Sequence, residues 1–322
     1  MDSEILNIDN ELVERGETKT IRLMVGRLPS DTRIYIQAHV FRSTEPGPVV
    51  LCLGGVHGDE INGVEILRKS IEDETFENIR KGTVIVIPLL NVFGFINFSR
   101  EVPDGKDVNR SFPGNMNGSL ASRVARTLTK KILPVVDYAL DFHTGGSSRY
   151  NYPQIRYSTK DKRGLKLAEA FDAPFIIRKG VIPNSFRKTC KDRGIPVIVY
   201  EGGESIRLCG NAIEHGITGI KKVLNALEMT QFDNLKVHNA KRIKKTTWVR
   251  AKYSGLFIWT KKSGQYVNKA EPIGVINDPF GMKMVKVLAP TSGYIIGHNN
   301  ASVVNQGDAL FHIGYEIEKS NS

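Results

Sequence analysis

The sequence predicts an α/β protein in which a mixed, mainly parallel sheet is flanked by helices and followed by a small all-β domain. Apolar runs without polar alternation recur from Val49 onward, as in strands that are buried on both faces. Stretches with helical periodicity lie between these runs, and the alternation of strand and helix is typical of α/β proteins. After about Lys241 only short alternating strands remain. We therefore expect two domains, residues 1–235 and 236–322.

The individual elements follow in chain order. Two early segments, "TKTIRLMVGRL" and "TRIYIQAHVFRS", alternate polar and apolar residues and predict antiparallel strands. The buried strands are predicted at "VVLCLGG", "TVIVIPLLN", "VVDYALDFH", "APFIIRKG" and "IPVIVYEGG". Helices are predicted over Glu60–Ile71, Ser119–Ile132, Lys162–Phe171 and Asn211–Glu228.

The last part of the chain contains an internal duplication of about forty residues. "SGLFIWTKKSGQYVNKAEPIGVI" and "SGYIIGHNNASVVNQGDALFHIG" share the same order of turns and apolar pairs. This pattern resembles the barrel-sandwich hybrid of lipoyl and biotinyl domains. Met282, Lys283 and Met284 match the core of a biotin attachment hairpin, but an "NDPFG" turn precedes them where carriers usually have Glu-Ala. A carrier or binding module modified at Lys283 is the non-enzymatic alternative.

Charge and cysteine content restrict the partners. The chain carries 45 basic and 34 acidic residues, and no acidic residue occurs between Lys236 and Lys262. This basic stretch has no known nucleic-acid signature and its aromatic residues alternate like strand residues, so we expect a solvated or anion-attracting face and no nucleic-acid partner. Three scattered cysteines form no disulfide framework, which indicates a cytoplasmic protein. Neither end has an apolar segment long enough for a membrane span.

Three candidate metal ligands follow buried strands. His57 and Glu60 lie three residues apart after the strand that ends at Leu53, so their side chains can converge. His143 follows another apolar run and precedes two glycines. Sites in α/β sheets cluster at the carboxyl ends of strands. Two histidines and a carboxylate are a donor set for catalytic zinc, with water as the fourth ligand. Asp141 is either a partner that orients a histidine ring or an ordinary strand-end residue.

Two further segments place polar groups near the same edge. "NVFGFINFSREVPDGKDVNRSFPG" concentrates Arg100, Asn109 and Arg110 in one loop, and arginine matches a carboxylate through two parallel hydrogen bonds. "IPVIVYEGGESIR" brings Glu201 to a strand end, with Glu204 three residues later. A hydrolase that uses zinc needs such a carboxylate as general base.

Four motifs in this order, "GGVHGDE", "DVNRSFPG", "DFHTGG" and "VYEGGE", resemble the succinylglutamate desuccinylase/aspartoacylase family. The likeness covers roughly residues 45–230, and the trailing β domain also fits. The resemblance implies a metallocarboxypeptidase-like fold and zinc chemistry. It also implies that the β domain roofs the cleft, for which we consider Tyr294, His298 or a nearby strand residue.

Residue roles follow from the same resemblance. His57, Glu60 and His143 match the ligands of one zinc ion per chain, and Glu201 matches the general base, with Glu204 as the alternative. Asn109 and Arg110 match the pair that holds a substrate carboxylate, and Arg100 matches the residue that polarises the scissile carbonyl.

The function that the resemblance implies is hydrolysis of the amide bond of a small anionic N-acyl amino acid or related N-acyl amine. The enzymatic alternative is a metallopeptidase of the carboxypeptidase type. We further expect a homo-oligomer, paired through a sheet edge or the β domain.

Overall fold

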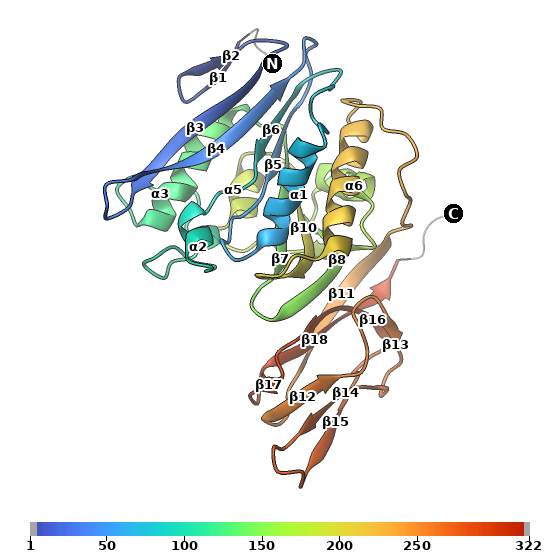
Figure 1. Cartoon of the computed structure of the whole chain (residues 1–322). Helices are drawn as coiled ribbons and strands as arrows, with labels where there is room; N and C mark the ends of the chain where they lie inside the picture. Colours follow the sequence, from blue (N-terminus) through green and yellow to red (C-terminus); the bar gives the residue numbers. More distant parts are fainter. Residues whose placement is uncertain (1–4, 319–322) are drawn as a thin grey trace.

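The computed structural model describes residues 5–318 and shows a mixed α/β fold built on one long mixed sheet (Figure 1). In spatial order its strands are β13 (Tyr266–Val267), β16 (Gly293–Asn299), β18 (Ala309–Ile317), β11 (Lys241–Arg250), β9 (Phe175–Lys179), β8 (Arg149–Ser158), β10 (Val197–Glu204), β7 (Tyr138–Gly145), β5 (Val49–Leu53), β6 (Thr83–Ile87), β4 (Arg33–Arg42) and β3 (Thr18–Arg27). The parallel neighbours β6, β5, β7 and β10 form its centre. A short hairpin, β1 (Leu6–Ile8) and β2 (Glu11–Val13), precedes it.

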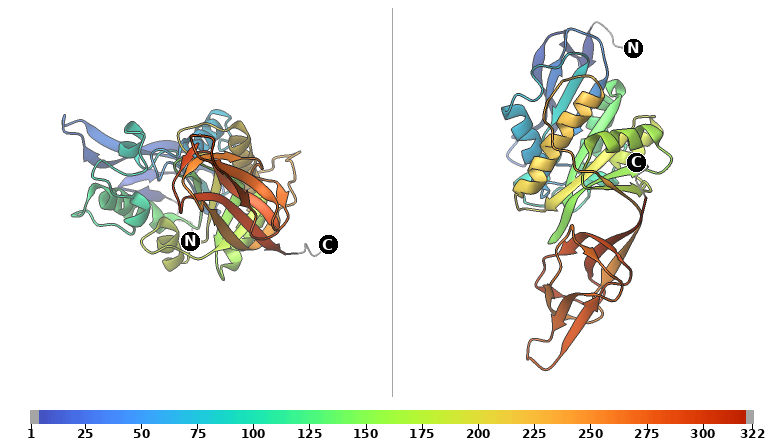
Figure 2. Two further views of the ribbon diagram at one scale, coloured as in Figure 1. Left: turned by 90° about the horizontal axis from the view of Figure 1, so that it is seen from below. Right: turned by 90° about the vertical axis from the view of Figure 1, so that its right-hand side faces the viewer.

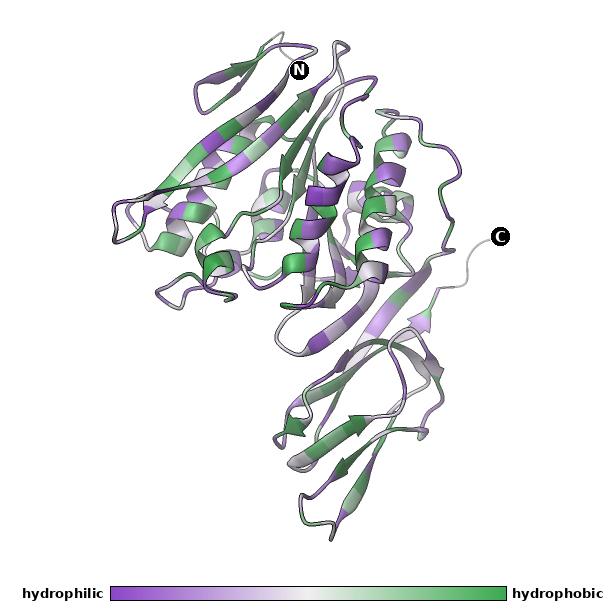
Figure 3. Ribbon diagram, viewed as in Figure 1, coloured by the Kyte–Doolittle hydropathy of each residue, from purple (hydrophilic) through white to green (hydrophobic). Residues whose placement is uncertain are grey.

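The central strands are buried on both faces, which explains their unbroken apolar runs. Every residue of β5 and β6 is buried. Val49, Leu51 and Leu53 of β5 join one hydrophobic core, whereas Val50 and Cys52 join the core on the opposite face. By contrast β3 and β4 pair antiparallel, and their ribbons alternate hydrophilic and hydrophobic bands as predicted (Figure 3).

Six α-helices occur within residues 5–318: α1 (Ile61–Glu72), α2 (Val92–Ile96), α3 (Leu120–Thr127), α4 (Lys162–Phe171), α5 (Phe186–Asp192) and α6 (Gly210–Ala226). Residues of α1, α4 and α6 belong to one core and residues of α3 and α5 to the other. The helices α1, α3, α4 and α6 were predicted within a few residues. The predicted range Ser119–Ile132 is divided in the structure into α3 and a π-helical turn that follows it (η2, Leu128–Ile132). The short helices α2 and α5 were not predicted. Among residues 5–318, no helix combines the length and apolarity needed to cross a membrane.

Strands from both halves of the chain close into a five-stranded barrel. The order β16-β18-β11-β9-β8 is completed by antiparallel pairing of β16 with β8. Phe175, Ile177, Ile243 and Ile296 form a separate small core on these strands, with Tyr152 against it. Hydrogen-bonded sheet therefore runs across residue 235, and the division into two domains at that position stays a prediction.

The remaining strands form a second sheet in the order β15 (Met284–Leu288), β14 (Pro272–Asn277), β12 (Gly255–Trp259) and β17 (Val303–Val304). Together with β11, β13, β16 and β18 they extend as a lobe from one end of the helical layers (Figure 2). Lys283 lies in the exposed turn between β14 and β15, with Nζ 3.9 Å from the ring centroid of Tyr253.

Basic residues of the 236–262 stretch contact acidic side chains from other segments. Lys245 Nζ lies 2.6 Å from Glu316 Oε1, and Lys261 Nζ lies 2.8 Å from Glu271 Oε1. Arg242 contacts Glu169. The local excess of positive charge is thus partly neutralised by the fold.

Candidate active site and metal centre

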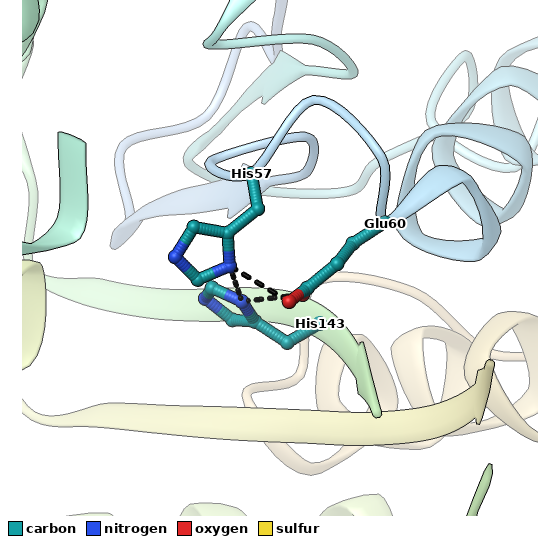
Figure 4. Close-up of side chains that lie close together, drawn as sticks. All are labelled: His57, Glu60 and His143. Carbon is teal, nitrogen blue, oxygen red and sulfur yellow. Dashed lines mark hydrogen bonds and ion pairs between the residues drawn. The ribbon is translucent and has the colours of Figure 1, made fainter. Parts of the chain in front are cut away.

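His57, Glu60 and His143 form a buried group that can hold a metal ion (Figure 4). Glu60 Oε1 lies 2.8 Å from His57 Nδ1, and Glu60 Oε2 lies 2.8 Å from His143 Nδ1. One potential ligand atom from each residue falls within 4.8 Å of the other two. The three residues are 2–5% exposed. The structure therefore brings together the three residues that the sequence singled out as ligands.

Local backbone structure explains why these side chains converge. His57 lies in the loop after β5, Glu60 is the N-cap residue of α1, and His143 lies on β7, next to β5. Helix α1 approaches β7 closely at Gly63, where a Cβ atom would lie 2.6 Å from the carbonyl oxygen of Phe142. The glycine lets the start of α1 pack directly against the strand that carries His143. The backbone N–H of Thr144 also donates to Glu60 Oε2 at 3.0 Å.

Each histidine has a carboxylate behind its second ring nitrogen. Asp141 Oδ2 lies 3.0 Å from His143 Nε2, and Asp107 Oδ1 lies 3.3 Å from His57 Nε2. The Asp107 contact is an ion-pair contact that lacks hydrogen-bond geometry. Carboxylates in this position fix the tautomer and the orientation of a ligating imidazole, leaving Nδ1 for the metal. Asp107 was not identified from the sequence.

Burial and the neighbouring charges act in opposite directions on the pKa values of the group. Burial acts to lower the pKa of His57, but Glu60 and Asp107 outweigh it and raise that pKa. Burial likewise opposes protonation of His143, yet Asp141 and Glu60 raise its pKa well above the usual value. Burial alone would raise the pKa of Glu60, whereas the two histidines hold it well below its ordinary value. Because metal ligands must be deprotonated, metal binding here is coupled to proton release.

The loop that carries Arg100 is anchored at both ends. Asn91 caps α2 by accepting from Gly94 N at 2.9 Å, and its Nδ2 donates to the carbonyl oxygen of Arg100 at 3.2 Å. Arg100 Nη1 lies 3.2 Å from both His57 Nδ1 and Glu60 Oε1. Asp107 holds the guanidinium from the other side through Nη2 at 2.9 Å. Arg100 is thus fixed directly beside the candidate ligands.

Asn109 and Arg110 both line the same cleft, which has a volume of about 620 Å³. Asn109 Oδ1 accepts from Phe186 N at 2.9 Å, so its amide NH₂ is the end it can offer to a ligand. Arg110 is exposed at the cleft, with Nη1 donating to the carbonyl oxygen of Asn109.

The two candidate bases are separated by the structure. Glu201 is 8% exposed and lines the cleft with the three candidate ligands. Its partners are Arg156, with Nη1 2.7 Å from Oε1, and Asn151, whose Nδ2 donates to Oε2 at 2.8 Å. Glu204 lines a different cavity and accepts from Asn300 Nδ2 at 2.5 Å. This placement favours Glu201 for chemistry at the metal group.

The residue that the C-terminal strands contribute to the cleft is Trp248 of β11. Its ring stacks on His312 at a centroid distance of 4.2 Å. Of the alternatives considered, a strand residue other than Tyr294 or His298 thus lines the cleft: Tyr294 packs against Phe175 at the barrel, and His298 lines the separate cavity with Glu204.

Arg156 and Arg187 also line the cleft, and the sequence analysis had not singled them out. No strand was predicted around Arg156, and only the pairing of β8 with β10 brings Arg156 to Glu201.

Comparisons with known proteins agree with this geometry. The family model of the succinylglutamate desuccinylase/aspartoacylase catalytic domain matches residues 46–227. An N-alpha-acetyl-L-2,4-diaminobutyric acid deacetylase from Halomonas elongata is 26% identical over 289 residues, covering 84% of this chain and 83% of the relative.

Two solved structures share the fold. A succinylglutamate desuccinylase/aspartoacylase from Rhodobacter sphaeroides has a TM-score of 0.83 at 26% identity, covering 93% of this chain and 95% of the other. The product-bound ectoine utilization protein EutE (DoeB) from Ruegeria pomeroyi has a TM-score of 0.83 at 22% identity with the same coverage.

Proposed function

Because the chain belongs to the succinylglutamate desuccinylase/aspartoacylase family, we propose that it is a zinc-dependent amidohydrolase that removes the acyl group from a small anionic N-acyl amino acid or related N-acyl amine. The observation that carries the proposal is the convergence of His57, Glu60 and His143 at the cleft. The deacetylase activity in the name of the Halomonas relative supports the same reaction class. We also infer a metallocarboxypeptidase-like fold for residues 1–235 and a barrel-sandwich-like domain for residues 236–322.

The donor set fits zinc. Two imidazole nitrogens and one carboxylate oxygen are the protein ligands of a common type of catalytic zinc site. Asp141 supplies the hydrogen bond to the second ring nitrogen that such ligands commonly have, and Asp107 places a carboxylate 3.3 Å from the corresponding nitrogen of His57. When bound, a zinc ion would supply a Lewis acid and lower the pKa of a water molecule to about 7.

The other side chains of the cleft each have a separate role in the reaction. The Glu201 carboxylate takes a proton from the attacking water and returns it to the leaving amine. The Arg100 guanidinium donates to the carbonyl oxygen as negative charge develops there. Arg110 and the NH₂ of Asn109 bind a carboxylate of the substrate, which fixes the amide in the orientation for attack. Collapse of the tetrahedral intermediate gives a carboxylic acid and an amine.

The proposal is tested by metal content and a substrate panel. We expect about one zinc per purified chain, lost with a chelator and restored by zinc. Amine release is measured from N-acetyl and N-succinyl amino acids, including N-acetyl-2,4-diaminobutyrate, with dipeptides for comparison. Glu201→Gln should lower kcat by about 10²- to 10⁴-fold. Glu204→Gln is the matched control and should retain turnover.

Several outcomes would contradict the proposal. A chain that takes up no zinc after reconstitution would exclude the metal mechanism. Cleavage of dipeptides alone would indicate a carboxypeptidase-type enzyme. Equal losses of kcat in Glu201→Gln and Glu204→Gln would contradict the assignment of Glu201 as the general base. A streptavidin-reactive chain without turnover would favour the carrier function at Lys283.

A further inference from the structure

The Glu201 carboxylate has a defined partner on each oxygen, and both partners come from β8. Arg156 Nη1 lies 2.7 Å from Oε1, and Asn151 Nδ2 donates to Oε2 at 2.8 Å. Asn151 is 6% exposed, and Arg156 lines the cleft beside Glu201. A carboxylate held in this way has one orientation and retains free lone pairs for a proton.

A β-bulge makes this double contact possible. Strands β8 and β10 pair antiparallel, with Glu201 opposite Gln154 and Gly203 opposite Asn151. The segment from Asn151 to Gln154 on β8 is therefore one residue longer than the segment from Glu201 to Gly203 that it faces on β10. In a regular strand, Asn151 and Arg156 are five residues apart and face opposite sides of the sheet. The extra residue restores them to the same side, and bulges next to active sites commonly redirect a side chain in this way.

The charges around Glu201 reinforce the contact. Burial lowers the pKa of Arg187, which also feels the positive charge of Arg156 and, in the opposite sense, the negative charges of Glu201 and Asp141. Burial together with Arg156 and Arg187 lowers the pKa of Lys179. Glu201 thus lies against one arginine, Arg156, and within the electrostatic reach of a second, Arg187.

We propose that Arg156 and Asn151 are positioning residues that hold the Glu201 carboxylate in the orientation from which it accepts a proton. Arg156 fixes Oε1, and Asn151 fixes Oε2. The inference rests on the proposed role of Glu201 as general base. It assigns a function to β8 and its bulge, neither of which contributes a candidate metal ligand.

The test separates positioning from substrate binding and from folding. In Arg156→Gln and in Asn151→Ala we expect kcat to fall about 10- to 100-fold while KM changes less than about twofold, because the base is misplaced but the substrate contacts persist. Arg156→Lys retains the charge and should recover part of the loss. Zinc content should match the parent protein in all variants. Lys179→Gln is the control: it removes a nearby cation bonded to Thr246 and should leave kcat unchanged.

The opposing outcomes are distinct. An increase in KM at constant kcat would show that Arg156 binds the substrate, and unchanged kinetics in both variants would show that neither residue positions the base. An equal loss in Lys179→Gln would indicate a general field effect. If Arg156→Gln does not fold, Asn151→Ala decides the matter alone. A parent protein without activity, or full activity in the Glu201→Gln variant, would refute the proposed function instead.

Discussion

Asp141→Asn tests whether the carboxylate behind His143 tunes the metal site. Asp141 is 1% exposed, and its Oδ2 lies 3.0 Å from His143 Nε2. When His143 binds a metal through Nδ1, its Nε2–H donates to Asp141, so the substitution replaces a charge-assisted hydrogen bond with a neutral one. The charge-assisted hydrogen bond contributes about 1.5–3 kcal/mol and the neutral one about 0.5–1.5 kcal/mol. The difference of about 1–1.5 kcal/mol corresponds to about a 5- to 13-fold weaker affinity for zinc.

The substitution also has a structural cost. Asp141 Oδ1 is buried and has no hydrogen-bond partner among residues 5–318, so the NH₂ of an asparagine would occupy that position without an acceptor. An unsatisfied buried donor costs about 1–3 kcal/mol in the free energy of unfolding.

Zinc affinity is measured by competition with a chromophoric chelator, and stability by urea unfolding. Asp161→Asn is the control, because Asp161 only caps α4 and asparagine caps a helix equally well. The reasoning is refuted if Asp141→Asn binds zinc as tightly as the parent.

Two further predictions concern packing and pH. Gly63→Ala should destabilise the fold by about 1–3 kcal/mol and lower zinc affinity, because its Cβ would lie 2.6 Å from the Phe142 carbonyl oxygen. Gly180→Ala is the control and should change thermal stability little, because there is open space around Gly180. Equal melting temperatures for the two variants would contradict this prediction. Burial lowers the pKa of His298 to about 4 from its ordinary 6.5, so the unfolded chain binds the proton first and up to about 3 kcal/mol of stability is lost as the pH falls from 6.5 to 4. His298→Gln should flatten that part of the stability profile, measured by urea unfolding at several pH values, and an unchanged slope would show that His298 does not contribute.

The strands and helices that were predicted well are those with strong local signals. The runs around Leu51, Leu140 and Val199 are apolar because both faces of the sheet are covered, and this property is visible in the sequence without knowledge of neighbours. The helix after Glu60 was likewise predicted from periodicity, and the structure begins it at Ile61. Glycines after the strands marked the edge where the candidate ligands meet.

Strand β8 was missed because its composition contradicts its environment. It contains Pro153 and buries the polar side chains of Asn151, Gln154 and Ser158. A strand that faces a cleft and a barrel interior has no simple polar alternation, and proline argues against a central strand. Its contact with Glu201 depends on strand pairing between segments some fifty residues apart, which local patterns do not encode.

Asp107 and Trp248 illustrate the same limit at the site. Asp107 lies two residues from Asn109 in a loop rich in charges, and only the fold shows that it supports Arg100 and His57. Trp248 belongs to a strand whose alternation was recognised, but its position at the cleft depends on the pairing of β11 with β9 at one end and with β18, where Trp248 lies opposite His312. Roles that depend on tertiary neighbours therefore had to come from the structure.

The five-stranded barrel also determines the order in which this protein can be completed during synthesis. Strands β8 and β9 leave the ribosome well before β16 and β18, which close the barrel at the far end of the chain. Until β11 is made, the edge of β9 is open and can pair with other chains, and until β16 is made Phe175 and Ile177 lack Ile296, which completes their small core. The nascent chain therefore exposes this strand edge and these apolar side chains at a stage when all three candidate metal ligands have already been made.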